Sequence, residues 1–322
     1  MAGKIIGFVK AWSLPLGILA GIAVYAVFHF VPQLEPLKPA ATSFAGRCIP
    51  VLLFVMLFLT FCKIAPKDLK VRRWHLWLAA IQIVSCVAIA VPLHFFPDFA
   101  YAEIAEGAMV CLVCPTAAAA AVITGKLGGS ESSLTTYTIV SNIVAAVVIP
   151  VVFPLVETHA DMSLPMQFVM ILKKVFPLLI FPMIGAWLVR YLLPAVHAFI
   201  LRHCGELAFY LWSFTMIMLI GQTIRAIVNS DVDAHVKWLL AVAGLVVCVL
   251  QFAAGKAIGG HYGDRISGGQ GLGQKNTVFA IWVSGAYLSP VVAIAPGSYI
   301  LWQNLINSWQ IWRKQKRDAE NA

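Results

Sequence analysis

Charged residues are scarce in this sequence. Of its 322 residues, 11% are charged and 61% are hydrophobic, whereas a soluble domain usually carries about 25% charged residues. So few charges cannot cover a globule in water, so the composition excludes a soluble protein and indicates a membrane protein. Strand-like alternation is missing as well, and the apolar runs are long. We therefore predict membrane-spanning helices, which satisfy their own backbone hydrogen bonds in lipid.

Catalytic and cofactor motifs are also missing. The chain has no HExxH, no GxSxG and no pair of carboxylates inside an apolar run, so a membrane-embedded enzyme is a weak alternative. No filter-like segment repeats, which argues against a channel. The one metal-like or redox-like cysteine spacing, Cys111 to Cys114, has no second pair or nearby histidines, and we interpret it as packing. We predict no enzyme activity and no cofactor.

Apolar runs of spanning length occur about ten times. The first follows Lys4 and Lys10 as a signal peptide would, but it is too long and lacks a small-residue cleavage site, so we expect a helix. The ninth is broken by polar residues. The runs cover residues 12–31, 45–64, 74–95, 106–127, 134–156, 166–192, 205–228, 236–258, 266–288 and 291–312.

The charges test this count independently. If both termini are cytoplasmic, an even number of spans places 16 of the 23 basic residues inside, as the positive-inside rule requires. The acidic residues Asp98, Glu103, Glu106, Glu157, Asp161, Asp231 and Asp233 then lie on or near the outer side. The net charge of +9 therefore indicates topology, and we predict a lipid bilayer and no nucleic acid as partner. The inside residues are Lys4, Lys10, Lys63, Lys67, Lys70, Arg72, Arg73, Lys126, Arg190, Arg202, Lys256, Arg265, Arg313, Lys314, Lys316 and Arg317.

Polar or helix-breaking residues interrupt the apolar pattern in three places. Residues 114–133, CPTAAAAAVITGKLGGSESS, suit either a helix interrupted inside the membrane or a tightly packed helix that ends at a Gly-Gly turn. Residues 267–282, SGGQGLGQKNTVFAIW, place Lys275 among glycines and amides; it lies either in a polar site or in a loop from which it reaches the interface. Gln82 lies in mid-helix, where an interhelical hydrogen bond is commoner than a ligand role.

Similar sequence segments precede two of these interruptions, the one in residues 114–133 and the one in residues 267–282. The run WLAAIQIVSCV from Trp77 precedes the first, and WLLAVAGLVVCV from Trp238 precedes the second. This internal similarity fits two halves of five helices each, residues 1–160 and 161–322. Because each half has an odd number of helices, the second half crosses the membrane in the opposite orientation to the first. Paired broken helices in such halves indicate a midplane substrate site, and their N-termini favour an anion.

The order of four segments resembles the bile acid:sodium symporter family over nearly the whole chain. The segments are VMLFLTFCKIAPKDL from Val55, the Gln82 helix, CPTAAAAAVITGKLGG and GLGQKN. The resemblance implies ten helices in two inverted repeats, with a core of helices 3–5 and 8–10 and a panel of helices 1, 2, 6 and 7. It further implies that the broken fourth and ninth helices cross and that an organic anion binds nearby, between core and panel. Substrate-binding candidates are Thr116, Ala118, Ala120, Ala121 and Asn276.

The resemblance carries over unevenly to the ion ligands. Gln82, Thr138 and Asn276 match family positions. The family's Ser-Asn pair falls on Ala120 and Ala121, its glutamate on Gly271 and its glutamine on Lys275. A shift of one residue puts Gln270 and Gln274 on the polar positions instead, with Lys275 as an insertion. No carboxylate remains in either register.

We therefore predict an organic-anion transporter that works by alternating access, in which the Lys275 ammonium replaces sodium. Gln82, Thr138, Ser141, Asn142 or crossover carbonyls are its candidate partners. A sodium symporter that uses Ser141, Asn142, Gln270 and Gln274 stays open. The substrate is either a steroid-like or fatty anion or a small carboxylate. With no transit peptide in view, we expect a prokaryotic inner membrane, and the oligomeric state stays open.

Overall fold

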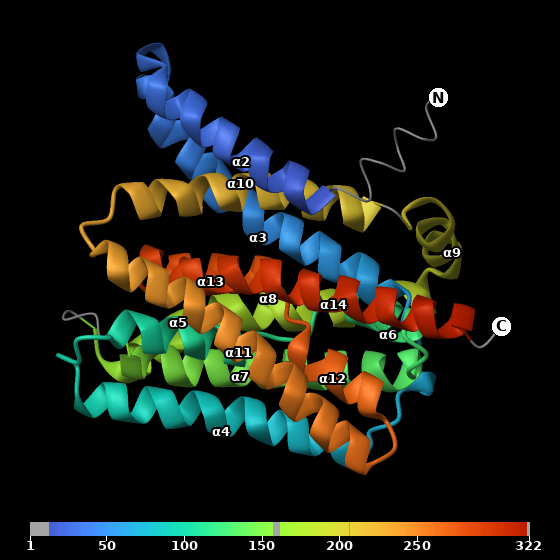
Figure 1. Cartoon of the computed structure of the whole chain (residues 1–322). Coiled ribbons are helices and arrows are strands. Elements are labelled where there is room, and N and C mark those ends of the chain that lie inside the picture. The colour runs from blue at the N-terminus through green and yellow to red at the C-terminus, as the bar shows by residue number, and fades with distance from the viewer. Residues whose placement is uncertain (1–12, 157–161, 206, 321–322) are drawn as a thin grey trace. The chain divides into compact units, whose positions relative to one another are not determined.

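The computed structural model describes residues 13–156, 162–205 and 207–320 (Figure 1). Regular structure in these segments consists of α-helices, three short 3₁₀ helices and one isolated antiparallel bridge. The predicted all-helical fold is confirmed. Several residues used in the topology prediction lie outside the described segments: Lys4, Lys10, Trp12, Glu157, Asp161 and Ala322.

Six described helices are long and apolar enough to cross a membrane. The helix α2 (Ser13–Phe30) is apolar but shorter. These helices confirm an integral membrane protein, while ten crossings in two inverted repeats stay a prediction. The six are α3 (Lys38–Cys62) with the preceding η1 (Pro32–Leu37), α4 (Arg73–Phe95), α7 (Glu131–Val156), α8 (Leu164–Leu192), α10 (Leu207–Val228) and α11 (Ala234–His261).

Two of the predicted spans are split into shorter helices. The first becomes α5 (Ala102–Val113) and α6 (Ala120–Lys126), and the second becomes α12 (Arg265–Gly273) and α13 (Thr277–Tyr287). The last span continues past its predicted end at residue 312, since α14 covers Ile294–Glu320 after η3 (Pro290–Ala293). The short helices η2 (Pro66–Asp68) and α9 (Pro194–His203) fall between apolar runs, so the hydropathy pattern did not predict them.

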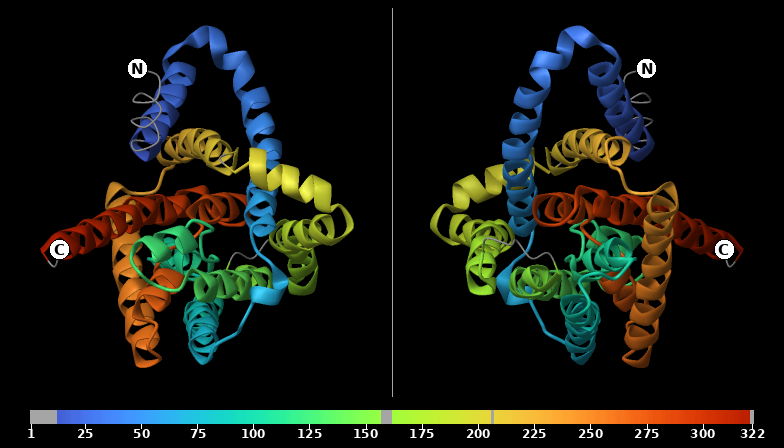
Figure 2. Two further views of the ribbon diagram at one scale, coloured as in Figure 1. Left: turned by 90° about the vertical axis from the view of Figure 1, so that its right-hand side faces the viewer. Right: turned by 90° about the vertical axis from the view of Figure 1, so that its left-hand side faces the viewer.

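The described residues of the segments 13–63 and 182–231 form one compact unit. In it, α2 and α3 are the two arms of a V joined at η1, and α10 packs against both arms (Figure 2). The contact between α2 and α10 is close because Gly21 has no side chain: a Cβ there would lie 2.7 Å from Cβ of Ile220. Small residues permit such approaches between membrane helices.

The described residues of the segments 64–181 and 232–320 form the second unit, which contains both helix breaks. In it, α4 packs along α5 and α7, and α11 packs against α12 and α14 (Figure 1). The hairpin of α11 and α12 depends on glycine, because the backbone of Gly268 is in contact with Gly255 and Gly259. Most of the glycines in residues 267–282 thus serve helix packing.

Candidate functional site

The first helix break follows from a proline. Proline at 115 disfavours helical geometry at the residue before it, and Cys114 is extended, with φ −59° and ψ 142°. The chain stays non-helical until α6 begins at Ala120. The extended stretch therefore carries backbone groups that need partners from elsewhere.

The second break occurs without proline. After α12 ends, Gln274 is extended, with φ −98° and ψ 97°. Asn276 then caps α13, since its Oδ1 accepts a hydrogen bond from the backbone N–H of Phe279 at 3.2 Å. A helix-capping role thus accounts locally for the asparagine that was expected to bind substrate.

The two extended segments cross and pair in one antiparallel bridge between Thr116 and Lys275. The Ala117 N–H donates to the Gln274 carbonyl, and the Asn276 N–H donates to the Pro115 carbonyl, both at 2.8 Å. Each segment thereby satisfies backbone groups that the other exposes. The structure brings four predicted site residues together here: Thr116, Gln274, Lys275 and Asn276.

Side chains extend this crossing toward α4 and α7. The Thr116 hydroxyl donates to the Gly271 carbonyl at 2.6 Å, and its backbone N–H donates to Ser141 Oγ at 3.0 Å. Ser141 in turn donates to Gln82 Oε1 at 3.1 Å, while Gln82 Nε2 donates to the Val113 carbonyl at 2.6 Å. Gln82 and Ser141 thus hold the end of α5, and Gln82 makes the interhelical hydrogen bonds expected of it.

Lys275 is buried at the crossing, with 1% of its surface exposed, instead of lying in a loop. Its Nζ donates to the Leu112 carbonyl of α5 at 3.0 Å. The thiols of Cys86, Cys111 and Cys114 lie close enough to interact electrostatically with the ammonium. Of the predicted partners, a backbone carbonyl next to the crossover is thus the one that the ammonium uses.

Three residues of the crossing were missed in the sequence. Gln303 Oε1 of α14 accepts a hydrogen bond from the backbone N–H of Lys275 at 2.9 Å. The Tyr299 hydroxyl donates to the Gly273 carbonyl at 2.7 Å and accepts from Gln251 Nε2 at 3.1 Å. The signal that could have found them is a polar residue inside an apolar helix, the same signal that singled out Gln82.

Other predicted ion ligands bond elsewhere. Thr138 donates to the Leu134 carbonyl of its own helix at 3.1 Å, and Asn142 Nδ2 donates to the Thr138 carbonyl at 2.7 Å. Gln270 Nε2 donates to Asn307 Oδ1 of α14 at 2.8 Å.

Three amide oxygens of the predicted ion ligands accept no hydrogen bond from the described part of the chain. Within the described segments, no hydrogen-bond partner reaches Asn142 Oδ1, Gln270 Oε1 or Gln274 Oε1. Buried oxygens without a donor are unusual and need an explanation. They are the groups to which a cation could bind.

The predicted alanine positions lie at the start of α6. Ala120 is fully buried, while Ala118 and Ala121 are half-buried. None of them carries a side-chain oxygen or nitrogen, so at these positions only the backbone can meet an ion or a substrate. Because the buried and half-buried residues are small, another chain segment can approach the crossing closely.

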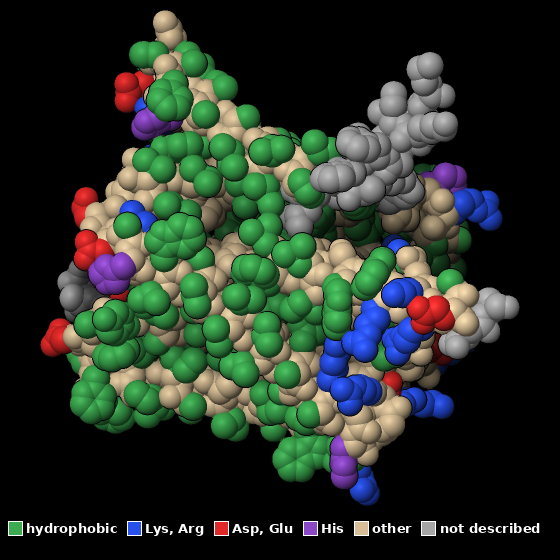
Figure 3. All heavy atoms as spheres, viewed as in Figure 1, with side chains coloured by type: hydrophobic (Ala, Val, Ile, Leu, Met, Phe, Trp, Pro, Cys, Tyr) green, Lys and Arg blue, Asp and Glu red, His purple; other side chains and the backbone are tan. Residues whose placement is uncertain are grey.

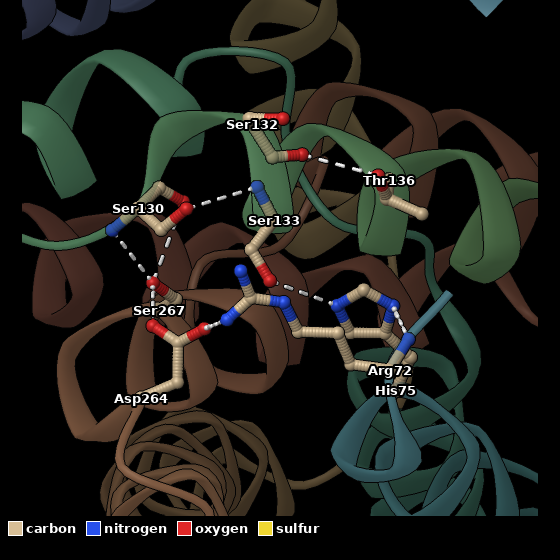
Figure 4. A network of polar contacts seen from close by, with 8 residues as sticks. All are labelled: Arg72, His75, Ser130, Ser132, Ser133, Thr136, Asp264 and Ser267. Atoms are coloured by element: carbon tan, nitrogen blue, oxygen red, sulfur yellow. Dashed lines mark hydrogen bonds and ion pairs between the residues drawn. The ribbon is translucent and has the colours of Figure 1, made fainter. Parts of the chain in front are cut away.

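A separate polar network joins the N-terminal ends of α4 and α12 (Figure 4). Asp264 accepts hydrogen bonds from Arg72 Nη1 at 2.9 Å and from Ser267 Oγ at 2.6 Å. The backbone N–H of Ser130, just before α7, donates to Ser267 Oγ at 3.0 Å. Each oxygen of the carboxylate therefore has a partner.

His75 continues the same network (Figure 4). Its Nδ1 accepts a hydrogen bond from the backbone N–H of Arg72 at 3.1 Å, so a neutral ring carries its proton on Nε2 and donates it to Ser133 Oγ at 3.2 Å. The charged and polar groups of the network are paired with one another. The network thus holds the N-terminal ends of α4, α7 and α12 relative to one another.

Two interrupted helices that cross inside an apolar helical unit are a hallmark of secondary transporters. The sequence model of the Sodium Bile acid symporter family matches residues 50–230, just over half of the chain. The chain therefore belongs to this family of transporters. The match includes the first break but ends before the second, so Lys275 lies outside it. No curated protein matches the chain.

Proposed function

We propose that the chain is a secondary active transporter of an organic anion that works by alternating access, with the Lys275 ammonium as a tethered substitute for sodium. The observation that carries this proposal is the position of the lysine. Its Nζ is buried at the crossing of the two interrupted helices and bonded to the Leu112 carbonyl. A fixed charge inside the membrane domain is costly, and such charges mark substrate and ion sites.

The chemistry of the neighbouring positions supports the substitution. A sodium ion needs several oxygen ligands and usually a compensating negative charge, and Ala120 and Ala121 offer neither. Lys275 supplies one positive charge that cannot diffuse away. The half-helices α6 and α13 both begin at this crossing, and their N-termini favour an anion there.

A sodium-coupled mechanism is the second candidate, and the unpartnered oxygens favour it. Asn142 Oδ1, Gln270 Oε1 and Gln274 Oε1 are buried without hydrogen-bond donors in the described part of the chain. Neutral amide oxygens are suitable ligands for a hard monovalent cation. In this alternative Lys275 is a structural residue and the family's coupling ion is retained.

The finer features of the proposal follow the family. Ten helices form two inverted five-helix repeats, both termini are cytoplasmic, and the membrane is a prokaryotic inner membrane. The substrate is a bile-acid-like anion or a smaller carboxylate. The described basic residues support the orientation, because Lys256 near the end of α11, Arg265 at the start of α12 and Arg313 in the C-terminal half of α14 lie near one another at one side of their unit.

Uptake of labelled anions into proteoliposomes tests the proposal. Taurocholate and pantoate represent the two substrate sizes, and each is measured with and without a sodium gradient. We expect saturable uptake of one of them in sodium-free buffer. Lys275→Ala and Lys275→Gln should abolish it, and Lys275→Arg should retain little, because a planar guanidinium does not fit a site shaped for a compact ammonium.

Lys173→Gln is the matched control, because Lys173 is an exposed lysine in the long apolar helix α8. It should transport like the wild type. Strong sodium stimulation of the wild type, together with near-normal uptake by Lys275→Ala, would refute the lysine mechanism and establish the sodium-coupled alternative.

A further inference from the structure

We infer that the basic ends of α11, α12 and α14 form a binding site for the phosphate headgroup of one anionic phospholipid. The three cations are Lys256 of α11, Arg265 of α12 and Arg313 of α14. The charges of Arg265 and Arg313 both act on Lys256, so each of the two guanidinium groups lies near this lysine. Figure 3 shows lysine and arginine side chains gathered over the region where Figure 1 places α12 and the C-terminal half of α14.

These cations are packed in place by their stems. The Lys256 side chain covers Gly269 of α12, where an added Cβ would lie 2.5 Å from Lys256 Cγ. The Arg265 side chain lies against Gly260 of α11, where an added Cβ would be 3.7 Å from Arg265 Cγ. Each stem crosses to the neighbouring helix, so the two charged heads are held near the same seam.

Their charges are not balanced by carboxylates. Among the described residues, Lys256, Arg265 and Arg313 have no ion pair. The carboxylates nearest in sequence on these helices have other partners: Asp264 binds Arg72, Asp318 binds Lys314 and Glu320 binds Lys316. Three like charges held together repel one another, and an anion bound among them would relieve that repulsion.

The surface leading to the cations points to a lipid as the source of the anion. On α14, Leu301, Leu305 and Trp309 are exposed at intervals of four residues, and Arg313 is the next position on that face. The Arg313 guanidinium lies over the Trp309 ring, 5.4 Å from its centroid. Tryptophan followed by a cation is typical of the membrane interface. An acyl chain along this face would bring its phosphate to Arg313.

The neighbouring helix repeats the pattern. On α11, Val246, Val249 and Ala253 are exposed, and Lys256 follows three residues later. The two helices pack side by side, and Ser298 of α14 donates to the Ala241 carbonyl of α11 at 2.7 Å. Two exposed apolar stripes on neighbouring helices thus lead to Lys256 and Arg313, an arrangement that fits a two-chain phospholipid better than a free anion.

Native mass spectrometry of the purified full chain in mild detergent tests the site. The probes are phosphatidylglycerol, phosphatidylcholine with the same acyl chains, and soluble glycerol phosphate as competitor. We expect one tightly bound phosphatidylglycerol, preferred over phosphatidylcholine and not displaced by glycerol phosphate. The triple variant Lys256→Gln, Arg265→Gln, Arg313→Gln should lower the affinity for phosphatidylglycerol about 100-fold. Each basic residue near a membrane surface strengthens the binding of an anionic lipid about 5-fold, and the three contributions multiply.

A matched triple variant removes three other cations from the same end of the unit: Lys67→Gln, Lys70→Gln, Arg73→Gln, all exposed. It should bind phosphatidylglycerol nearly as well as the wild type. Equal losses in both triple variants, equal binding of phosphatidylcholine, or displacement by glycerol phosphate would each overturn the proposal. If the first triple variant does not fold, Lys256→Gln and Arg313→Gln alone should each weaken binding about 5-fold, and an unchanged affinity in both would overturn it as well.

Discussion

Replacing Thr116 by valine tests whether side chains hold the two interrupted helices together. Valine keeps the shape of threonine but lacks the hydroxyl that donates to the Gly271 carbonyl at 2.6 Å. Because Thr116 is almost completely buried, no water can take the donor's place, and the carbonyl stays unsatisfied. An unsatisfied buried acceptor costs about 1–3 kcal/mol. For a unit of this size, we expect the melting temperature to fall by about 4–8 °C for a 2 kcal/mol loss.

The assay is thermal unfolding in detergent at a fixed scan rate, followed by intrinsic fluorescence. Thr116→Ser keeps the hydroxyl and should behave like the wild type. Thr215→Val is the matched control, because Thr215 is as deeply buried as Thr116. Its hydroxyl donates to the Leu211 carbonyl of its own helix, and that carbonyl also accepts a backbone hydrogen bond of the helix, so it stays satisfied without the hydroxyl. A shift in Thr116→Val no larger than that in Thr215→Val would show that the hydroxyl does not stabilise the crossing.

Two further predictions concern helix packing and topology. Gly259→Ala should lower the melting temperature by several degrees, because its Cβ would lie 2.5 Å from the Asp264 carbonyl oxygen and overpacking costs about 1–3 kcal/mol. Gly285→Ala is the control: there is open space around its Cβ, so the melting temperature should stay the same or rise. Equal effects of the two substitutions would contradict the close packing of α11 on α12. A reporter fused after Ala322 should be active on the cytoplasmic side, and activity found only outside would reverse the predicted orientation.

The sequence could predict the two helix breaks because each leaves a local mark. Proline at 115 disfavours a helical residue before it, and the cluster of glycines and amides around Lys275 does not suit a lipid-facing helix. The crossing of the two breaks came from the family resemblance and not from local pattern. The residues that interrupt each helix are neighbours in the sequence, whereas the crossing of the two interruptions depends on how all helices of the unit pack.

The sequence could not predict which groups complete the crossing. Gln303 and Tyr299 lie in the last helix, some thirty residues after the second break, and no local rule relates them to Lys275 or Gly273. The capping role of Asn276 is visible only once the start of α13 is known, and its predicted contact with substrate stays a prediction. Long-range hydrogen bonds of this kind depend on tertiary packing, which composition and spacing do not encode.

The two ends of Lys275 have different partners, and this separates its structural role from its proposed function. Its backbone holds the crossing, since the N–H donates to Gln303 and the residue pairs with Thr116 in the bridge. Its side chain reaches a different helix, where Nζ bonds the Leu112 carbonyl. The ammonium can therefore change partners during a transport cycle without opening the bridge. For the same reason, substitutions that keep the backbone but remove the charge should change transport much more than they change folding.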